Sequence, residues 1–171
     1  MTVTPALLRV GLGPRLEAEW IHRELGHVIG QIPPFDLKAL IAHFGLSLDV
    51  YPLRSEISGL LLHFDRKYHI VVNQRHNRVR RCWTAAHELY HYLAHRWRLA
   101  PLSGRNGGGP ETEEMELEAN AFAAELLMPE AWVKSNWSRI WNVGQCAELF
   151  GVSITAMRLR LEELRILRRG R

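Results

Sequence analysis

The chain has 171 residues, of which 47% are hydrophobic and 23% are charged, a globular composition that excludes a disordered or fibrous protein. Its net charge of +4 owes much to arginines near the C-terminus, which either contact nucleic acid or an acidic partner, or form a solvated helix face. Because there are two cysteines, no signal-peptide pattern and only short apolar runs, we expect a soluble cytoplasmic protein with one ordinary domain, or one domain with a small appendage.

Two packing helices are predicted before the first strand. Apolar side chains recur at helical spacing in residues 15–30, and a glycine and two prolines close that segment. Asp36 is a suitable N-cap for a second, short helix, and Gly45 is a suitable residue to end it. His22 and His27 have the chemistry of metal ligands, but they are five positions apart and point in different directions around a helix. We therefore expect no metal site in the first helix.

Three strands are predicted next. Residues 46–50 alternate between apolar and polar side chains, which indicates a strand that ends at Pro52. Residues 57–64 and 68–73 are two apolar runs separated by a polar turn, which is typical of a β-hairpin. Gly59 inside the first run predicts a bulge or a close backbone approach, where an extended substrate could add itself as a strand; alternatively, it only bends the sheet.

The sequence HELYH is the most informative motif in the chain. It lies in residues 80–94, which contain good helix formers and neither glycine nor proline, so a helix is expected there. On a helix, His87 and His91 share one face and direct their imidazoles at a common point, as a zinc ion requires. Glu88 can reach the open side of the metal and take a proton from a bound water. The pattern is HExxH, the signature of zinc hydrolases.

A second helix is predicted at residues 111–128, after a glycine- and proline-rich connection at residues 96–110. Glu116 follows His91 far enough along the chain for a loop and a helix to return to the metal, although spacing alone does not separate Glu116 from Glu118. A metal-bound histidine usually donates its other N–H to a polar partner, and Asn120, one turn after Glu116, is a suitable acceptor.

The two helices together resemble those of the ImmA/IrrE family of zinc metallopeptidases. The likeness is carried by WTAAHELYH at residues 83–91 and by ELEANAFAAELLMP at residues 116–129. Gly59, and Ile70 with Asn73 before the metal helix, also look like family positions.

The resemblance implies a zincin-like α+β fold, in which we expect a small mixed or antiparallel sheet. It also implies that His87, His91 and Glu116 bind one zinc ion and that Glu88 is the general base. The family's E-x-x-x-N pattern selects Glu116 over Glu118. In such a site, zinc polarises the peptide carbonyl and lowers the pKa of water, while the base accepts a proton and later passes it to the leaving amine.

Family members typically regulate mobile elements, stress responses or toxin–antitoxin loci by cutting a helix-turn-helix repressor, so the resemblance implies a repressor or antitoxin as the protein substrate. The sequence departs from the family pattern at Tyr90, where glycine is common, and at Cys82, where a basic residue is common. Both departures concern substrate fit more than chemistry. An additional oxyanion donor is expected, with Tyr92, His95 and arginines of the following loop as unassigned candidates.

The C-terminal segment supplies the rival hypothesis. Residues 145–167 have the shape of a helix-turn-helix, with Ser153 as the N-cap of a basic second helix whose Arg158 and Arg160 could face phosphate. A DNA-binding regulator, or one that sequesters a repressor without cutting it, is therefore the alternative. Against DNA binding, the second helix carries an apolar stripe that needs a neighbour: Ile154, Met157, Leu161, Leu164 and Leu167. We predict a metallopeptidase domain at residues 1–140 and a helical segment packed on it at 141–171, with the oligomeric state undetermined.

Overall fold

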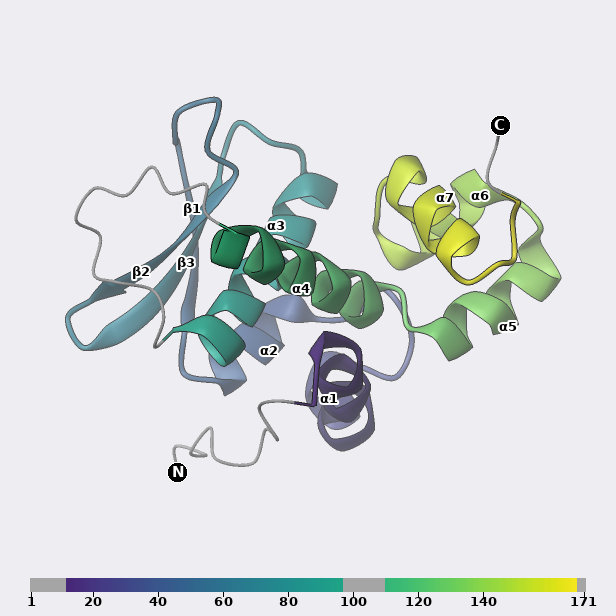
Figure 1. Cartoon of the computed structure of the whole chain (residues 1–171), viewed down its shortest axis with the longest axis horizontal. Coiled ribbons are helices and arrows are strands. Elements are labelled where there is room, and N and C mark those ends of the chain that lie inside the picture. Colours follow the sequence, from purple (N-terminus) through teal and green to yellow (C-terminus); the bar gives the residue numbers. More distant parts are fainter. Residues whose placement is uncertain (1–11, 97–109, 169–171) are drawn as a thin grey trace.

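The computed structural model describes residues 12–96 and 110–168, with the side chains of residues 110–112 left undescribed (Figure 1). The predicted connection at residues 96–110 therefore lies outside the described residues, apart from its two ends. In chain order the elements are α1 (Pro14–Ile29), α2 (Leu37–His43), β1 (Ser47–Tyr51), β2 (Gly59–Phe64), β3 (Lys67–Asn73), α3 (Arg78–Tyr90), the π-helical turn η2 (His91–His95), α4 (Pro110–Leu127), α5 (Glu130–Ile140), α6 (Val143–Phe150) and α7 (Ile154–Glu163).

The three strands form one mixed sheet in the order β1-β3-β2, which confirms the α+β fold. The hairpin of β2 and β3 is antiparallel, and it turns at Asp65 and Arg66, whose φ angles of 48° and 60° are those of a two-residue turn that matches the twist of the strands. β1 pairs in parallel with β3. The central strand β3 is the most buried of the three, so it anchors the sheet in the core.

Helices α3 and α4 lie between the sheet and the C-terminal helices (Figure 1). α3 contacts β2 and β3 as well as α4, and α4 also contacts α1. The faces of α3 and α4 in the core contain fully buried alanines, among them Ala86, Ala119 and Ala123. Small side chains let two helices approach closely, so polar residues on the adjoining faces of α3 and α4 can meet. Within the described residues, no helix combines the length and apolarity needed to cross a membrane.

The C-terminal helices begin and turn as the sequence predicts. Ser153 is the N-cap of α7 and accepts a hydrogen bond from the Ala156 amide, while Gly151 ends α6 with a φ of 65° in the left-handed region. The predicted apolar stripe on α7 is only partly buried. Met157 and Leu161 lie in the core, whereas Ile154 is 59% exposed because it lies in the first turn of α7.

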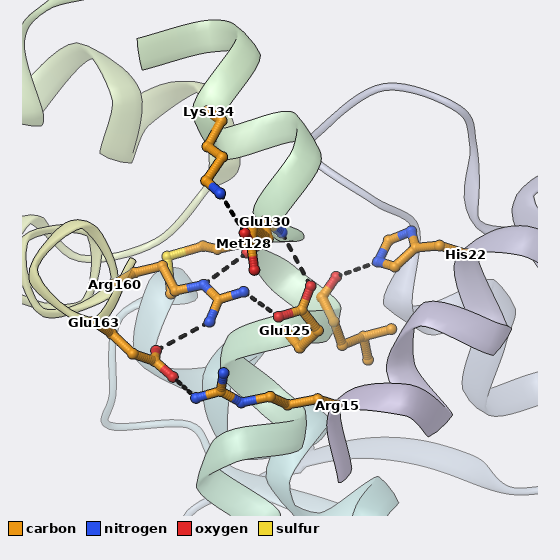
Figure 2. A network of polar contacts seen from close by, with 9 residues as sticks. Arg15, His22, Glu125, Met128, Glu130, Lys134, Arg160 and Glu163 are labelled. Carbon is orange, nitrogen blue, oxygen red and sulfur yellow. Dashed lines mark hydrogen bonds and ion pairs between the residues drawn. The ribbon is translucent and has the colours of Figure 1, made fainter. Parts of the chain in front are cut away.

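Arg160 of α7 does not face solvent, so the prediction that it could contact phosphate is wrong. Its guanidinium pairs with the buried carboxylate of Glu125, and it donates to the Met128 carbonyl and to Glu163, both at 3.0 Å (Figure 2). Glu163 also pairs with Arg15 of α1. These contacts join α7 to the C-terminal end of α4, where a buried arginine needs such partners to offset its lost hydration.

Candidate metal centre

Two histidines of the HExxH motif meet at the end of α3. The helix begins at Asn77, whose side chain accepts from the Arg80 amide, and His87 lies in its last full turn. His91 is the first residue of η2, where the chain changes from α-helical to π-helical; the predicted helix through residue 94 therefore ends in a different geometry. The Nε2 atoms of His87 and His91 are 3.0 Å apart, so both rings present a nitrogen to one point.

Glu116 of α4 completes a cluster of three donor groups. Its two carboxylate oxygens lie 3.2 Å from the Nε2 atoms of His87 and His91, and the three donor atoms lie within 4.8 Å of one another. A tetrahedral ion with bonds of about 2.0–2.1 Å spaces its ligands about 3.3–3.4 Å apart, so this arrangement fits a zinc ion. The donor set of two imidazoles and one carboxylate leaves a fourth position for water or substrate.

The structure separates the two acidic residues that spacing left open. The Glu118 carboxylate lies 2.8 Å from His95 Nε2 and outside the three-residue cluster. Asn120, in contrast, lies at the cluster, with its Oδ1 3.2 Å from His87 Nδ1. Asn120 was expected to contact one of the two motif histidines, and the structure shows that it contacts His87. An N–H on His87 Nδ1 would donate to Asn120 and leave Nε2 free to bind a cation.

Burial sets the charge state of the residues around the cluster. The pKa of His91 is lowered to about 3 by burial and by the neighbouring rings of His87 and His95, so the imidazole is neutral at physiological pH, as a ligand must be. The pKa of Glu88 is raised to about 7 by burial and by the Glu116 carboxylate. Glu88 is thus half-protonated near neutral pH in the metal-free protein.

An open cavity of about 540 Å³ gives access to the cluster. Residues from the β2 edge, α3 and α4 line it, and they include Gly59, Trp83, Glu88 and Glu116. Arg80, which sequence analysis did not select, also lines this cavity and donates to the Ser58 hydroxyl at 3.0 Å. Arg80 lies seven positions before His87, two helical turns earlier on the same face, and that spacing was the available signal.

Of the two alternatives predicted for Gly59, the structure shows the close approach and not the bulge. It pairs in regular register with Val72, so the strand is not interrupted. A Cβ at position 59 would lie 2.4 Å from the Thr84 side chain and 3.4 Å from Cγ of Glu88. The glycine therefore lets the turn of α3 that carries the motif lie directly against the sheet.

His22, Tyr92 and His95, which the sequence analysis considered, do not line the cavity. His22 donates through Nε2 to the Leu126 carbonyl at 2.8 Å and lies edge-on to Phe35. Tyr92 is buried against Tyr68, and His95 is buried against His91 and Glu118. His95 therefore does not face the cavity as an oxyanion donor would. Arg96 donates to the Tyr92 carbonyl at 3.1 Å and does not line the cavity, and the later arginines of the loop lie outside the described residues.

Comparison with known proteins shows the family of the chain. The model of the Peptidase_M78 family, described as an IrrE N-terminal-like domain, matches residues 47–162. The chain belongs to the Peptidase_M78 family. As a member of this family it is expected to be a metallopeptidase, and the resemblance to ImmA/IrrE proteins is confirmed.

The Peptidase_M78 chain is also similar to one curated protein and to one solved structure. It is 29% identical over 128 residues to an uncharacterized immunity region protein 2 of Bacillus phage phi105, covering 74% of this chain and 80% of that protein. It also shares its fold with a Mycobacterium tuberculosis transcriptional regulator, with a TM-score of 0.61 and 18% identity over 86% of this chain. The chain spans 46% of that regulator, so it matches less than half of the solved protein.

Proposed function

We propose that the protein is a zinc-dependent endopeptidase in which His87, His91 and Glu116 hold one zinc ion and Glu88 is the general base. The observation that carries the proposal is the convergence of two imidazole nitrogens and a carboxylate at 3.0–3.2 Å beside the partly buried Glu88, in a cavity open to substrate. A bound zinc ion supplies Lewis-acid polarisation and lowers the pKa of water to about 7.

Glu88 is suited to move the proton in such a reaction. In the metal-free protein, burial and the Glu116 carboxylate raise the pKa of Glu88 to about 7. A carboxylate beside the metal-bound water could accept a proton from it and return that proton to the leaving amine. A cation beside the carboxylate favours its ionised form, so metal binding prepares Glu88 to accept. Arg80 at the cavity is a cationic group that can bind the carbonyl oxygens or acidic side chains of a peptide.

As the substrate we propose a helix-turn-helix repressor or antitoxin in the cytoplasm, whose cleavage relieves repression. The phage relative is named for an immunity region, and the structural neighbour is named as a transcriptional regulator, which supports a regulatory setting. A second cavity of about 360 Å³ lies between α3 and the α6–α7 turn and shares Arg80 and Trp83 with the first. Together the two cavities offer space for several residues of a polypeptide substrate. The division into domains at residues 1–140 and 141–171 is part of this proposal.

The first experiment is elemental analysis of the purified wild type and three variants. We expect about one zinc ion per chain in the wild type and in Glu88→Gln, and loss of zinc in His91→Ala and Glu116→Ala. Glu114→Gln is the matched control, because Glu114 is an exposed acid on the same helix as Glu116. A wild type that binds no zinc when the metal is supplied at neutral pH contradicts the proposal.

The second experiment distinguishes cleavage from sequestration. Repressors encoded beside the protein are incubated with zinc-loaded wild type and with zinc-loaded Glu88→Gln, and the products are identified by mass spectrometry. Cleavage by the wild type alone is the expected result. Equal relief of DNA binding by both proteins, with the repressor intact, would instead establish sequestration.

A further inference from the structure

A chain of two hydrogen bonds lies behind His91, on the opposite side of its ring from the metal cluster. His91 Nδ1 is 3.0 Å from His95 Nδ1, and His95 Nε2 is 2.8 Å from a carboxylate oxygen of Glu118. His91 and His95 are 7% and 2% exposed, so water does not compete for these contacts. None of the roles assigned above uses Glu118, although its carboxylate is directed at a buried histidine.

The direction of each hydrogen bond follows if His91 binds a metal through Nε2, the nitrogen that faces His87 and Glu116. His91 can bind a cation through Nε2 only if that nitrogen carries no proton, which places its proton on Nδ1. The Nδ1–H of His91 then donates to His95 Nδ1, and this nitrogen must be unprotonated to accept. The proton of His95 consequently lies on Nε2, from which it donates to Glu118. One arrangement of protons therefore satisfies every nitrogen and the carboxylate.

We propose that His95 and Glu118 are positioning residues that hold His91 in the tautomer and orientation that bind zinc. The inference rests on the proposed ligand set and deepens it. His87 receives a comparable contact from Asn120, so each ligand histidine is held by a residue of α4. For His87 the contact is direct, whereas for His91 it passes through His95. Loss of such an outer partner typically weakens metal binding by about 10–100-fold.

The test is a double-mutant cycle on zinc affinity, measured by competition with a chromogenic chelator at fixed pH. We expect Glu118→Gln to weaken binding roughly tenfold and His95→Phe by about 10–100-fold. The double variant should bind no more than about twofold more weakly than His95→Phe, because Glu118 acts through the imidazole that is already absent. Glu114→Gln should bind as the wild type does, because Glu114 is an exposed acid of the same helix.

Three results would overturn the inference, and one of them also overturns the proposed function. Zinc affinity of Glu118→Gln within twofold of the wild type would exclude the role of Glu118. If the losses of zinc affinity in the two single variants multiply in the double variant, the Glu118 carboxylate acts on the metal site through its charge and not through His95. A wild type that does not bind zinc would refute the ligand set itself.

Thermal unfolding of the metal-free variants in EDTA separates a positioning role from a merely structural one. If Glu118 is a positioning residue, Glu118→Gln should weaken zinc affinity without changing the Tm of the metal-free protein. A fall in Tm that accounts for the whole loss of affinity would argue for a structural role. If His95→Phe does not fold, His95→Asn replaces it. An asparagine amide oxygen can take the place of Nδ1 and accept from His91, but it no longer links His91 to Glu118. The zinc affinity of His95→Asn should therefore be weaker than that of the wild type, at least as much as in Glu118→Gln, and adding Glu118→Gln should change it by no more than about twofold; an affinity equal to that of the wild type would contradict the inference.

Discussion

Replacement of Glu88 by glutamine should stabilise the metal-free protein at alkaline pH, although it removes the proposed general base. Burial and the Glu116 carboxylate raise the pKa of Glu88 from 4.5 to about 7 in the folded protein. Because the folded state holds this proton more tightly than the unfolded state, ionisation of Glu88 lowers the free energy of unfolding. One pKa unit corresponds to about 1.4 kcal/mol, so the full cost approaches about 3 kcal/mol. Glutamine is uncharged and avoids that cost.

The pH dependence has a defined sign. Well below pH 4.5 the carboxyl is protonated in both states and costs nothing. The cost grows as the pH rises through 4.5 towards about 7, and it is complete above about 7. Urea unfolding in EDTA, followed by tryptophan fluorescence, should therefore show Glu88→Gln up to about 3 kcal/mol more stable than the wild type at pH 8 and of similar stability at pH 4.5. Saturating zinc should reduce the difference at pH 8, because a cation favours the ionised carboxylate.

The exposed variant Glu114→Gln controls for the general effect of removing a negative charge. Equal stabilities of the wild type and Glu88→Gln at pH 8 would refute the reasoning, since the ionised Glu88 would then carry no penalty from its surroundings. If Glu88→Gln increases the free energy of unfolding as much at pH 4.5 as at pH 8, the reasoning is also refuted, because the effect would then come from packing rather than from ionisation of Glu88.

Three further predictions concern packing and the metal. Gly59→Ala should lower stability by about 1–3 kcal/mol because its methyl group overlaps the Thr84 side chain, and Thr84→Ser, which removes the contacting methyl, should restore part of the loss in a thermal melt. Arg160→Met should lower the free energy of unfolding in urea by about 3–5 kcal/mol, because it leaves the buried Glu125 carboxylate without its ion-pair partner. Adding Glu125→Gln should recover stability, and a double variant in which the two losses add would contradict this prediction. EDTA should remove about 3 kcal/mol of apparent stability from protein held at 100-fold excess zinc over Kd, with no effect on Glu116→Ala.

The local features of the fold were predictable from the sequence. Asp36 caps α2 as expected, accepting from the Ala39 amide, and the hairpin and the close approach of His87 to His91 follow from short-range spacing. A contact of Asn120 with one of the motif histidines was also expected, because a metal-bound histidine usually has a polar partner, and the structure shows that His87 is the one contacted. In each case the informative residues lie within a few positions of one another or belong to a motif with a known mechanism.

Features that depend on distant parts of the chain were not predictable in the same way. The parallel pairing of β1 with β3 is set by how the chain crosses the sheet, and the alternation of side chains does not encode it. Arg160 was predicted to be an exposed basic residue, because its partner Glu125 lies 35 positions earlier and no local pattern in the sequence connects the two. The π-helical turn at His91 was missed for another reason, since the helical period in the sequence does not distinguish it from continued α-helix.

The close contact between Gly59 and α3 restricts how sequences of this architecture can diverge. Because a methyl group at this position would meet Thr84 and approach Glu88, a substitution in the sheet would displace the residue proposed to move the proton. Small residues that perform no chemistry are thus expected to vary as little as the acidic and imidazole groups beside them. Changes in specificity would then arise from the exposed rim of the cavity, for example at Glu56 and Arg80, where a new side chain has room.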